Sequence, residues 1–522
     1  MFWADRIADE IRDTRKPKDG KRFVIRDEKT MSGRVHIGSM RGVAIHGLIG
    51  ESLAEMGVAN IYKYELNDFD PFDTVPSYLD QAKFKEHLGK PLFTVPSPEP
   101  GFTNYAEFFG AEFVSVHKKA GFIPEYYRAT ELYKSGKMDQ YIKRALEKAS
   151  DIRRILKEVS GSEKDASWLP VSVVCEKCGK IMTTSVSDFD GETVAYACDK
   201  NPDDIASCGH RGRVDPFKGG SKLFWKVDWA AKWGAGGVDI EGGGKDHSTK
   251  GGARDVANHI AREVFAIEPP HDIPYEFFLV GGAKMSSSKG RGSSAKDMAE
   301  LFPPQILRLI LIGKDIKEQI NVDPSGDSVP KMYDWYDDLT ERIGEGKSDN
   351  YARLYALCQL PDERAELAAP WQMRFREVAF IVQMPHLDLK TEAQKAKGVD
   401  LNDDEVRALL LRAGYAKLWL AAYAPEEFKY VLQEKLPAVV LSELQKKALR
   451  EIHLYIGASE RTGEEIHARL HELKGEIPIT PSELFKAIYR IFLNRDSGPK
   501  AGWLLSALSR DLVLKRLQEV SQ

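Results

Sequence analysis

Two hydrophobic patterns follow one another along the chain, and the change falls near residue 303. Before it, short apolar runs such as residues 23–25 and 60–66 alternate with glycine-containing turns and with segments of helical spacing. This alternation predicts an α/β domain built on a parallel sheet. After residue 303 the strand patterns vanish, and helical segments predict an all-α half that forms a bundle or cage. Examples of these segments are residues 305–312, 405–423, 442–456, 482–493 and 502–517.

The first strand leads into a turn and a helix with candidate nucleotide-binding chemistry. Gly33 lets the backbone turn tightly, and Gly38 removes a side chain where a purine or ribose could lie. His36 stands at the helix start, where backbone amides favour anions, so its imidazole could donate a hydrogen bond to a phosphate in a transition state. A helix that simply begins near a histidine is the alternative. The apolar residues of the helix are Ile37, Met40, Val43, Ala44, Leu48 and Leu53.

A second stretch, residues 275–290, again places an apolar strand and glycines before a loop. Lys284 and Lys289 bracket three serines in this loop. A loop that brings ammonium and hydroxyl groups onto a triphosphate suits attack at the α-phosphate with pyrophosphate leaving. A solvated linker is the usual interpretation of such a composition. The loop occurs in the same chain as residues 36–39, and each of the two segments follows an apolar strand. This combination favours a loop that binds a triphosphate.

Residues 221–267 return to the main fold after a long insertion. The aromatic run 223–229 predicts a strand or the end of one, and residues 238–241 predict a short strand. The glycine-rich segment 242–247 follows, with Asp246 and His247 directed into the ligand crevice, and a helix runs on to residue 265. Residues 67–70 end the second strand, so their carboxylates either face this crevice or cap the next turn.

These segments resemble the two signatures of class I aminoacyl-tRNA synthetases, and within that class they are most similar to the class I (archaeal-type) lysyl-tRNA synthetase. The resemblance covers roughly residues 1–310 well. Two positions depart from the class pattern. Ser39 replaces the second histidine of the first signature, and Ser287 replaces the usual second lysine of the loop, for which Lys289 is the candidate substitute. The segments that carry the resemblance are residues 30–33, 36–39, 225–229, 244–247, 251–252 and 284–290.

The resemblance implies a reaction and a set of site residues. It implies that L-lysine is joined to tRNA(Lys) through a lysyl-adenylate, with ATP and Mg²⁺. His36, Lys284 and Lys289 would be catalytic. The amino-acid pocket would contain Thr30, Trp225, His247 and Tyr275, with either Glu28 or Asp246 supplying the charge for the substrate ammonium; core packing is the alternative for Trp225 and Tyr275. The ATP-binding residues would be Gly33, Gly38, Ser39, Met285, Ser286, Ser287 and Ser288.

Four of the five cysteines lie within about 35 residues. Cys175 and Cys178 form a knuckle, and Cys198 and Cys208 follow at wider spacing. This set predicts a structural Zn²⁺ held by thiolates in a zinc-ribbon-like segment, residues 175–210. Cys198 is the ligand least supported by spacing, and the His210 imidazole is an alternative ligand. The fifth, Cys358, lies in an apolar helical stretch typical of a core.

Residues 138–159 predict one long amphipathic helix. Its apolar face follows a near-heptad spacing, and its other face carries six Lys and Arg residues with few interleaved acids. Such a face is usually only solvated. Contact with nucleic-acid phosphates is the alternative interpretation.

The composition sets limits on these interpretations. With 522 residues and a formal net charge of −4, any nucleic acid must be held by local basic patches. Five cysteines in so long a chain favour a reducing cytosol and thus a cytoplasmic protein. No signal-peptide pattern or apolar run of about 18 residues indicates a membrane segment. The sequence does not specify an oligomer, so a monomer is favoured.

The expected organisation has four parts. Residues 1–66 form the first half of a Rossmann-like catalytic domain, and residues 67–220 form a connective insertion with the zinc-binding segment. Residues 221–302 form the second catalytic half with the signature loop, and residues 303–522 form a helical domain that the resemblance implies binds the anticodon, with Arg490, Arg495 or Lys500 as candidate phosphate contacts.

Three other functions are alternatives for this chain. One alternative is a class I synthetase for glutamate, cysteine or arginine. Another is a related nucleotidyltransferase that acts without tRNA, and a third is a non-catalytic RNA-binding protein that keeps the fold. The long helical half argues against the second, and the intact His36, Gly38 and Lys284 argue against the third.

Overall fold

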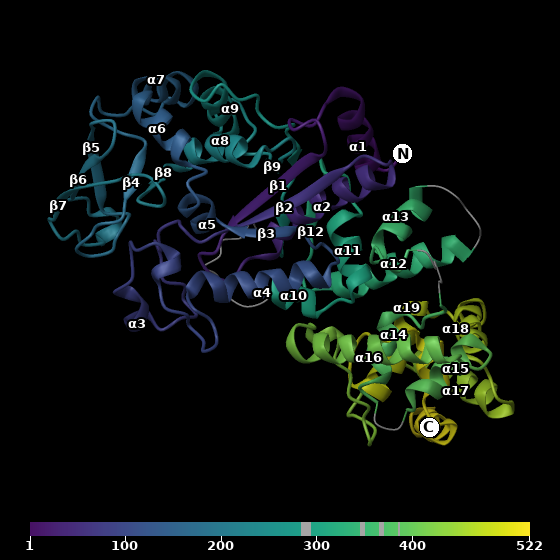
Figure 1. Ribbon diagram of the computed structural model, residues 1–522. Coiled ribbons are helices and arrows are strands. Elements are labelled where there is room, and N and C mark those ends of the chain that lie inside the picture. The colour runs from purple at the N-terminus through teal and green to yellow at the C-terminus, as the bar shows by residue number, and fades with distance from the viewer. Residues whose placement is uncertain (283–293, 345–349, 365–369, 385–386, 522) are drawn as a thin grey trace. The chain divides into compact units, whose positions relative to one another are not determined.

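The structure is a computed structural model that describes residues 1–282, 294–344, 350–364, 370–384 and 387–521. It divides into two compact units, Met1–Val322 with Ser348–Glu366, and Asp323–Lys347 with Leu367–Gln522 (Figure 1). Helices α10 (Ala295–Glu300), α11 (Pro304–Ile312) and α13 (Asn350–Cys358) belong to the first unit. The division between units therefore falls about 20 residues beyond the change of pattern expected at residue 303.

A parallel sheet forms the centre of the first unit. Strands β1 (Phe23–Thr30), β2 (Asn60–Asn67) and β3 (Glu125–Arg128) pair in that order, with Thr30 opposite Asn67 at the carboxyl edge. Both expected strands at residues 23–25 and 60–66 are confirmed. On the other side of β1, Ile240 forms parallel bridges with Ile25 and His271. The expected strand at residues 238–241 is thus only a bridge, and β9 (Gly243–Gly244) and β10 (Pro274–Tyr275) extend it.

Helix α2 (Met40–Glu55) follows the first signature through a 3₁₀ turn, η1 (Ile37–Ser39). Nearly all its residues are buried, including the polar His46 and Ser52, because α1 (Trp3–Thr14), α11 and the sheet enclose it. The helix expected from apolar spacing after His36 is confirmed. It is more deeply enclosed than one apolar stripe predicts.

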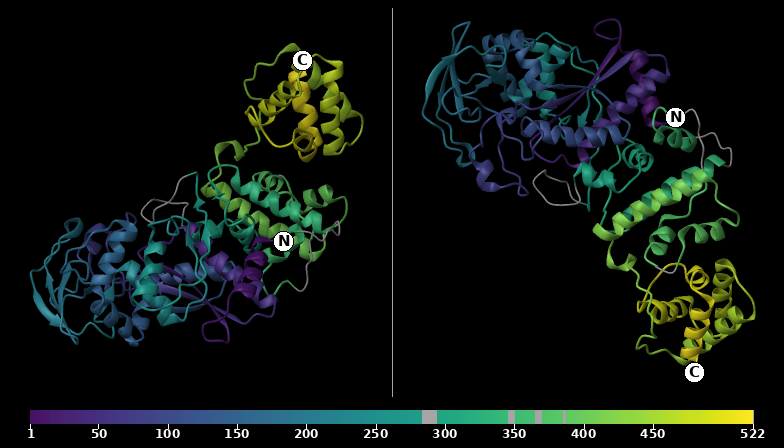
Figure 2. Two further views of the ribbon diagram at one scale, coloured as in Figure 1. Left: turned by 90° about the horizontal axis from the view of Figure 1, so that it is seen from above. Right: turned by 60° about the horizontal axis from the view of Figure 1, so that its bottom comes forward.

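The insertion between the two halves of the sheet contains helices and a small antiparallel sheet (Figure 2). Its helices are α3 (Gln81–Lys85), η2 (Leu92–Thr94), α4 (Tyr105–Lys119), α5 (Ala129–Lys134), α6 (Asp139–Glu147), α7 (Ala149–Ser160) and η3 (Pro202–Asp204). Its strands are β4 (Val171–Val173), β5 (Thr184–Phe189), β6 (Val194–Cys198), β7 (Arg211–Val214) and β8 (Ser221–Leu223), in the sheets β5-β6-β7 and β4-β8.

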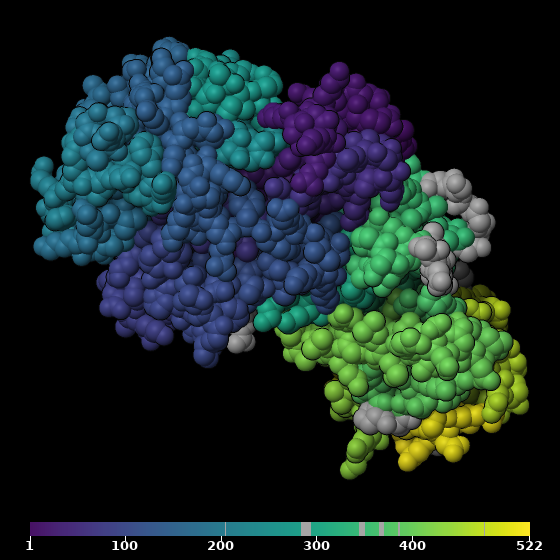
Figure 3. Space-filling model, viewed as in Figure 1, coloured from purple at the N-terminus to yellow at the C-terminus, as the bar shows by residue number. Residues whose placement is uncertain are grey.

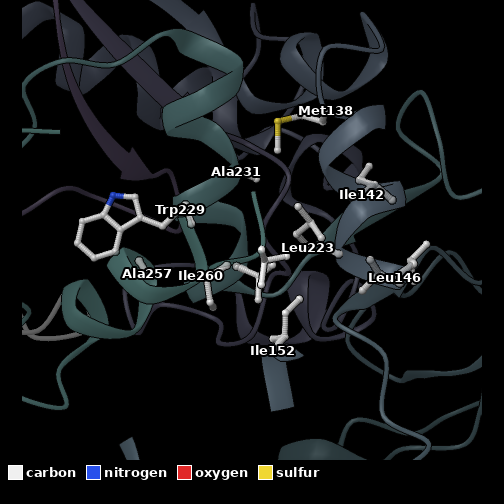
Figure 4. Close-up of a cluster of buried hydrophobic side chains, with 14 of the residues drawn as sticks. Met138, Ile142, Leu146, Ile152, Leu223, Trp229, Ala231, Ala257 and Ile260 are labelled. Atoms are coloured by element: carbon white, nitrogen blue, oxygen red, sulfur yellow. The ribbon is translucent and has the colours of Figure 1, made fainter. Parts of the chain in front are cut away.

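The single helix expected at residues 138–159 is wrong. Lys148 leaves helical geometry at φ −106° and ψ 23°, so α6 ends there and α7 begins. The break has a packing reason: α6 lies against α8 (Trp225–Gly236), whereas α7 lies against α9 (Ala253–Glu263). Figure 4 shows Ile142 and Leu146 of α6 and Ile152 of α7 entering the same apolar cluster as Ala257 and Ile260 of α9.

The basic face of α6 and α7 is largely used inside the protein. Arg144 donates to the Val264 carbonyl at 3.0 Å and Arg153 to the Trp168 carbonyl at 2.8 Å. Arg154 pairs with Glu158 and Glu263 at 2.9 and 2.7 Å. These contacts hold three of the six basic side chains against the protein and so favour the structural interpretation of this face. Contact with nucleic-acid phosphates stays the alternative prediction.

The aromatic run at residues 223–229 is a helix rather than a strand. Strand β8 ends at Leu223, and α8 begins at Trp225. Trp229 and Trp233 lie one turn apart and are both buried in the insertion's core. Tertiary burial on nearly all sides of α8 removes the helical alternation that would have signalled it.

The second unit is helical in the residues that the structure describes, and Cys358 of the first unit is buried as expected. Strand β11 (Phe278–Leu279) lies in the apolar stretch expected before the signature loop. Its partner β12 (Ile320–Asn321), also in the first unit, falls after residue 303, where no strand was expected. Within the described ranges, no helix has the length and apolarity to span a bilayer. The helices of the second unit are α12 (Ser328–Gly344), α14 (Phe375–Ile381), α15 (Leu389–Lys397), α16 (Asp403–Ala422), η4 (Glu426–Phe428), α17 (Glu443–Ala458), α18 (Gly463–Glu476), α19 (Pro481–Leu493), α20 (Ala501–Ala507) and α21 (Arg510–Ser521).

Candidate active site

The carboxyl edge of β1 and β2 gathers polar side chains. The Thr30 hydroxyl donates to Asp70 Oδ2 at 2.6 Å, and the Asn67 amide donates to the same oxygen at 3.0 Å. Asp68 instead accepts from the Thr130 backbone and hydroxyl at 2.9 and 2.6 Å, at the start of α5. The carboxylates of residues 67–70 were expected either to face the ligand crevice or to cap the next turn, and each alternative holds for one of them. Asp68 caps the start of α5, and Asp70 lies beside Thr30 on the crevice side.

His36 immediately precedes η1, with its ring against Gly38. A Cβ on Gly38 would lie 2.8 Å from His36 Nδ1, so the glycine makes room for the imidazole as well as for any nucleotide. Nδ1 is buried and has no hydrogen-bond partner within the described ranges. Burial and the nearby Lys29 ammonium lower the pKa of His36 to about 4, so the ring is neutral at physiological pH.

The turn before His36 is fixed by tyrosines from the insertion. The Tyr105 hydroxyl donates to the Ser32 carbonyl at 2.9 Å, and the Tyr78 oxygen accepts from the Arg34 backbone at 2.6 Å. A Cβ on Gly33 would lie 2.7 Å from the Tyr78 hydroxyl oxygen, so only glycine fits. Ser39 precedes α2 without making a cap hydrogen bond through its side chain.

The signature loop lies outside the described residues, and with it Lys284, Met285, Ser286, Ser287, Ser288 and Lys289. Its described flanks both meet the first signature. Gly38 faces the Phe278 carbonyl of β11, with a Cβ at 3.4 Å from that oxygen. The Ala295 backbone donates to the Val35 carbonyl at 2.8 Å, and Ser294 bridges to His36. The described residues on both sides of the loop are therefore in backbone contact with the first signature.

A buried ion network lies beneath the crevice. Arg26 pairs with Glu28, with Glu65 at 2.8 Å and with Glu241 at 2.6 Å. Lys232 of α8 pairs with Glu28, Glu65 and Asp228 at 3.2, 2.6 and 2.9 Å. Sequence reasoning missed this network apart from Glu28. The available signal was an arginine inside an apolar strand and a lysine between buried alanines and tryptophans of α8.

A further lysine extends the network to the crevice. Lys222 pairs with Asp228 at 3.2 Å and with Asp70 at 2.6 Å. Glu28 and Asp70 are its accessible carboxylates, with 21% and 30% of their side chains exposed. Burial alone would raise the pKa of Glu28, but Lys232 and Arg26 outweigh burial and lower the pKa to about 2. Both carboxylates therefore carry a full negative charge at neutral pH.

Aromatic rings form one wall beside the network. The Trp225 ring is half exposed, stacks on Trp229 at 6.2 Å and meets the edge of His247 at 5.6 Å. Trp229 in turn donates to Glu241 at 2.9 Å, and Glu241 binds Arg26 of the network. Trp225 is therefore not a core residue, and the structure brings Trp225 and His247 together.

Tyr275 and Asp246 make different contacts. A Cβ on Gly42 would lie 2.7 Å from the Tyr275 hydroxyl and 2.9 Å from Asp27 Oδ2, and a Cβ on Gly244 would lie 2.8 Å from Asp246 Oδ1. Because consecutive strand residues face opposite sides, Asp27 and Glu28 point away from each other. Tyr275 thus lies with Asp27, away from the group that contains Glu28. Among described residues, the two candidate carboxylates are Glu28 within the network and Asp246 near Gly244.

His46 ties α2 to the glycine-rich loop. Its Nδ1 lies 2.7 Å from the Gly42 carbonyl, and its Nε2 accepts the Gly242 backbone N–H at 2.8 Å. An imidazole that accepts an N–H at Nε2 is neutral and carries its proton on Nδ1. This side chain therefore fixes the helix after the first signature against the loop that carries His247.

The four clustered cysteines converge in the small sheet of the insertion. The Sγ atoms of Cys175, Cys178, Cys198 and Cys208 all lie within 4.8 Å of one another. Cys175 and Cys208 are 3.6 Å apart, and Cys178 and Cys198 are 3.8 Å apart. A tetrahedral site with Zn–S bonds of about 2.3 Å has sulfur–sulfur edges of about 3.8 Å. The set fits zinc without His210, and the segment lies at the edge of the first unit in Figure 3.

Comparison with known proteins shows which family the chain resembles. The family model described as "tRNA synthetases class I (K)" matches residues 1–360. A lysine–tRNA ligase of Methanosarcina barkeri (strain Fusaro / DSM 804) is 36% identical, over 100% of this chain and 98% of that protein. A lysine–tRNA ligase of Archaeoglobus fulgidus is 32% identical over 99% of each. A solved glutamate tRNA ligase from Elizabethkingia meningosepticum covers 96% of this chain and 99% of its own, at 11% identity and a TM-score of 0.41.

Proposed function

Because the chain belongs to the family of class I tRNA synthetases for lysine, we propose how its residues divide the work of a lysine–tRNA ligase. The family model and relatives that span the whole chain support the ligase activity itself, and they disfavour the alternatives of another amino acid or of a nucleotidyltransferase without tRNA. One observation carries the assignment of the site: the signature histidine and two accessible carboxylates, Glu28 and Asp70, lie at the carboxyl edge of one parallel sheet.

The first step is adenylation. The lysine carboxylate attacks the α-phosphate of ATP in line, and pyrophosphate leaves. His36 donates a hydrogen bond to the phosphate as its negative charge grows, and Lys284 and Lys289 are the proposed cations of the loop. Gly33, Gly38 and Ser39 line the nucleotide side with Met285 and Ser286–Ser288. The 3′-terminal ribose hydroxyl of tRNA then attacks the adenylate carbonyl, so no protein nucleophile is needed.

Mg²⁺ is proposed to arrive with ATP. Within the described ranges, the one cluster of three or more ligand groups close enough to share an ion is the cysteine set. Mg²⁺ characteristically keeps waters and binds substrate phosphates, whose charge it neutralises. The protein's own contributions are the hydrogen bond from the neutral His36 imidazole and the proposed Lys284 and Lys289 ammonium groups.

The amino-acid pocket is proposed to lie between Trp225 and the ion network. The aliphatic stem of lysine would pack on the exposed Trp225 ring and His247, beside Thr30. Asp70 would accept the α-ammonium, because it is held by Thr30, the last residue of β1 before the first signature, whereas Glu28 lies two residues earlier on the strand. Glu28 would accept the ε-ammonium. Glu28 and Thr30, which holds Asp70, are two residues apart on β1, a spacing of about 6.6 Å. This spacing is close to the length of a lysine side chain at about 1.5 Å per bond, so one lysine could reach both carboxylates.

Replacing Glu28 with glutamine tests the pocket. We expect the KM for lysine to rise about a hundredfold, with the KM for ATP unchanged, because a buried charge-assisted partner of the ε-ammonium is lost. Steady-state aminoacylation of tRNA measures both constants. Asp246→Asn is the matched variant at the other candidate carboxylate. A large loss in Asp246→Asn with a normal Glu28→Gln would assign the charge to Asp246 and to the Tyr275 side.

The cysteine set is proposed to hold a structural Zn²⁺. The four thiolates fill a tetrahedral coordination sphere, so no position stays open for substrate. The Cys208 backbone N–H lies 3.4 Å from Cys198 Sγ, and the Thr183 hydroxyl lies 3.2 Å from it, so both stabilise a thiolate there. The metal would hold the turns of a zinc-ribbon-bearing insertion.

The helical second unit is proposed to bind the anticodon. Arg490 and Arg495 line a cavity of about 330 Å³ together with Val440, whose side chain is 90% exposed. Arg490 is fixed by Asp496 at 2.6 Å, so its guanidinium is oriented before RNA arrives. An exposed apolar side chain between fixed arginines suits a stacked base with flanking phosphates. We also propose that the enzyme acts in the cytoplasm as a monomer.

Charging of total tRNA with each radiolabelled amino acid, with ATP and Mg²⁺ present, tests the function. Some class I enzymes activate their amino acid only with tRNA bound, so the tRNA belongs in the assay. Charging with lysine alone is the expected result. Charging with glutamate, cysteine or arginine would overturn the proposed pocket, and binding of ATP without any charging would overturn the reaction.

A further inference from the structure

The buried ion network beneath the crevice has unequal numbers of charges. Its cations are Arg26, Lys222 and Lys232, and its carboxylates are Glu28, Glu65, Asp70, Asp228 and Glu241. Three positive and five negative groups leave a net charge of −2. Arg26, Lys222, Lys232, Glu65, Asp228 and Glu241 are all at least nine-tenths buried. Water therefore screens this excess poorly.

Two of the fully buried carboxylates, Asp228 and Glu241, each accept from several donors. Burial raises the pKa of Glu241, and the charge of Arg26 opposes that shift. Asp228 binds Lys222 and Lys232 and accepts from the Tyr133 hydroxyl at 2.6 Å. Glu241 binds Arg26 and accepts from the indole N–H groups of Trp229 and Trp233 at 2.9 and 2.8 Å. A carboxylate that accepts only from donors is stabilised as the anion.

The surroundings do not cancel the excess. On the other face of β1, Asp27 and Lys29 add one charge of each sign. Behind Trp233, Arg254 has its counter-charge in Asp272 at 3.7 Å. His46 accepts a backbone N–H and is neutral. The excess of −2 therefore belongs to the network itself.

We propose that the net charge of this network, and not only its exposed carboxylates, selects a substrate with two ammonium groups. The inference rests on the proposed function. The lysine carboxylate is directed at the α-phosphate of ATP, so the groups that lysine brings to the network are its α- and ε-ammonium, with two positive charges. An amino acid with an uncharged side chain brings only one. Asp228 is then a specificity-determining residue that substrate never touches. It shares the charge of Lys222 and Lys232, which would otherwise neutralise Asp70 and Glu28.

The test changes the charge count without altering the exposed carboxylates. Asp228→Asn has a count of −1, and we expect its KM for lysine to rise about thirtyfold, the effect of one charge at about 8 Å in an effective dielectric of 20. Asp228→Asn/Lys222→Met returns the count to −2, and its KM for lysine is expected within about threefold of wild type. Tyr133→Phe, which removes a hydrogen bond to Asp228 but no charge, is the matched control and should change little.

Two further measurements separate the proposal from simple damage. The KM for ATP should stay constant in all variants. Norleucine lacks the ε-ammonium, so the substitutions should weaken its inhibition less than they weaken lysine binding. If Asp228→Asn does not fold, the comparison can be made between Lys222→Met, whose network has a net charge of −3, and the double variant, whose network has −2. Lysine should then bind the double variant more weakly than it binds Lys222→Met. The proposal would be overturned if the double variant had a higher KM for lysine than Asp228→Asn. It would also be overturned if the substitutions weakened norleucine and lysine binding equally. Failure of wild type to charge lysine would instead reject the proposed function.

Discussion

Alanine at His36 is expected to slow lysyl-adenylate formation by about a hundred- to a thousandfold, the usual effect of removing one preorganised donor from a developing negative charge. The structure places this imidazole directly before η1, with a buried Nδ1 that has no partner among described residues. The preorganised ring loses no protein hydrogen bond when it turns to a phosphate. Single-turnover adenylate formation, with tRNA present, measures the rate.

The pH dependence of this step gives a second expectation. Because burial and Lys29 lower the pKa of His36 to about 4, the ring stays neutral as the pH falls from 8 to about 5. The rate should therefore show no loss from His36 in that range, and protonation of His36 should enter only near pH 4. An inflection near pH 6.5 that disappears in His36→Gln would contradict the assigned environment.

The matched control is His259→Ala. His259 is an exposed histidine of α9, paired with Glu263 at 2.9 Å and remote from the signature. Its loss should leave adenylation near wild type. Thermal melting should be similar for both variants, because the buried His36 Nδ1 has no hydrogen-bond partner in the part of the chain that the structure describes, so no such bond is lost. Near-normal adenylation by a folded His36→Ala variant would reject the proposed role.

The sequence predicts the opening strand, turn and helix of the fold well because their signals are local. The strand at residues 23–25 and the helix after His36 show their period within a few residues, and each is confirmed. The break at Lys148 has no such signal. No proline or glycine marks it, and it follows from the positions of α8 and α9, which are distant in sequence.

The same distinction applies to the site. His36 and the cysteines are recognisable because signature and spacing are read along the chain. Asp228 and Lys232 lie at i and i+4 on α8, but the sequence predicts a strand or the end of one for the run that contains Asp228, so their shared helix face is not apparent from it. The structure buries both: Lys232 pairs with Glu28 of β1 and Glu65 of β2, and Asp228 pairs with Lys222 and Lys232. Such a network depends on three separated segments and has no pattern of its own.

Loss of one zinc ligand should destabilise the insertion more than any other single change considered. Structural zinc sites contribute about 10 kcal/mol or more to the folding of the segment that binds them. In Cys178→Ser we expect zinc content to fall from about one per chain to near zero. The turns at residues 175–180 and 198–210 should then become open to proteolysis. Metal analysis and limited proteolysis measure these changes.

Cys358→Ser provides the matched control for this variant. Cys358 is equally a reduced cysteine and is fully buried, but it lies in α13 and outside the cysteine set. It should keep its zinc and an intact 175–210 segment, even if its melting temperature falls. The apolar residues Ile181, Val186 and Val194 pack in a cluster with α8 and α9 that, in the described ranges, contains no residue of β1 or β2, so Cys178→Ser should keep a folded parallel sheet while the ribbon opens. Purified wild-type protein without zinc, or a Cys178→Ser variant as resistant to protease as Cys358→Ser, would show that packing alone holds the ribbon.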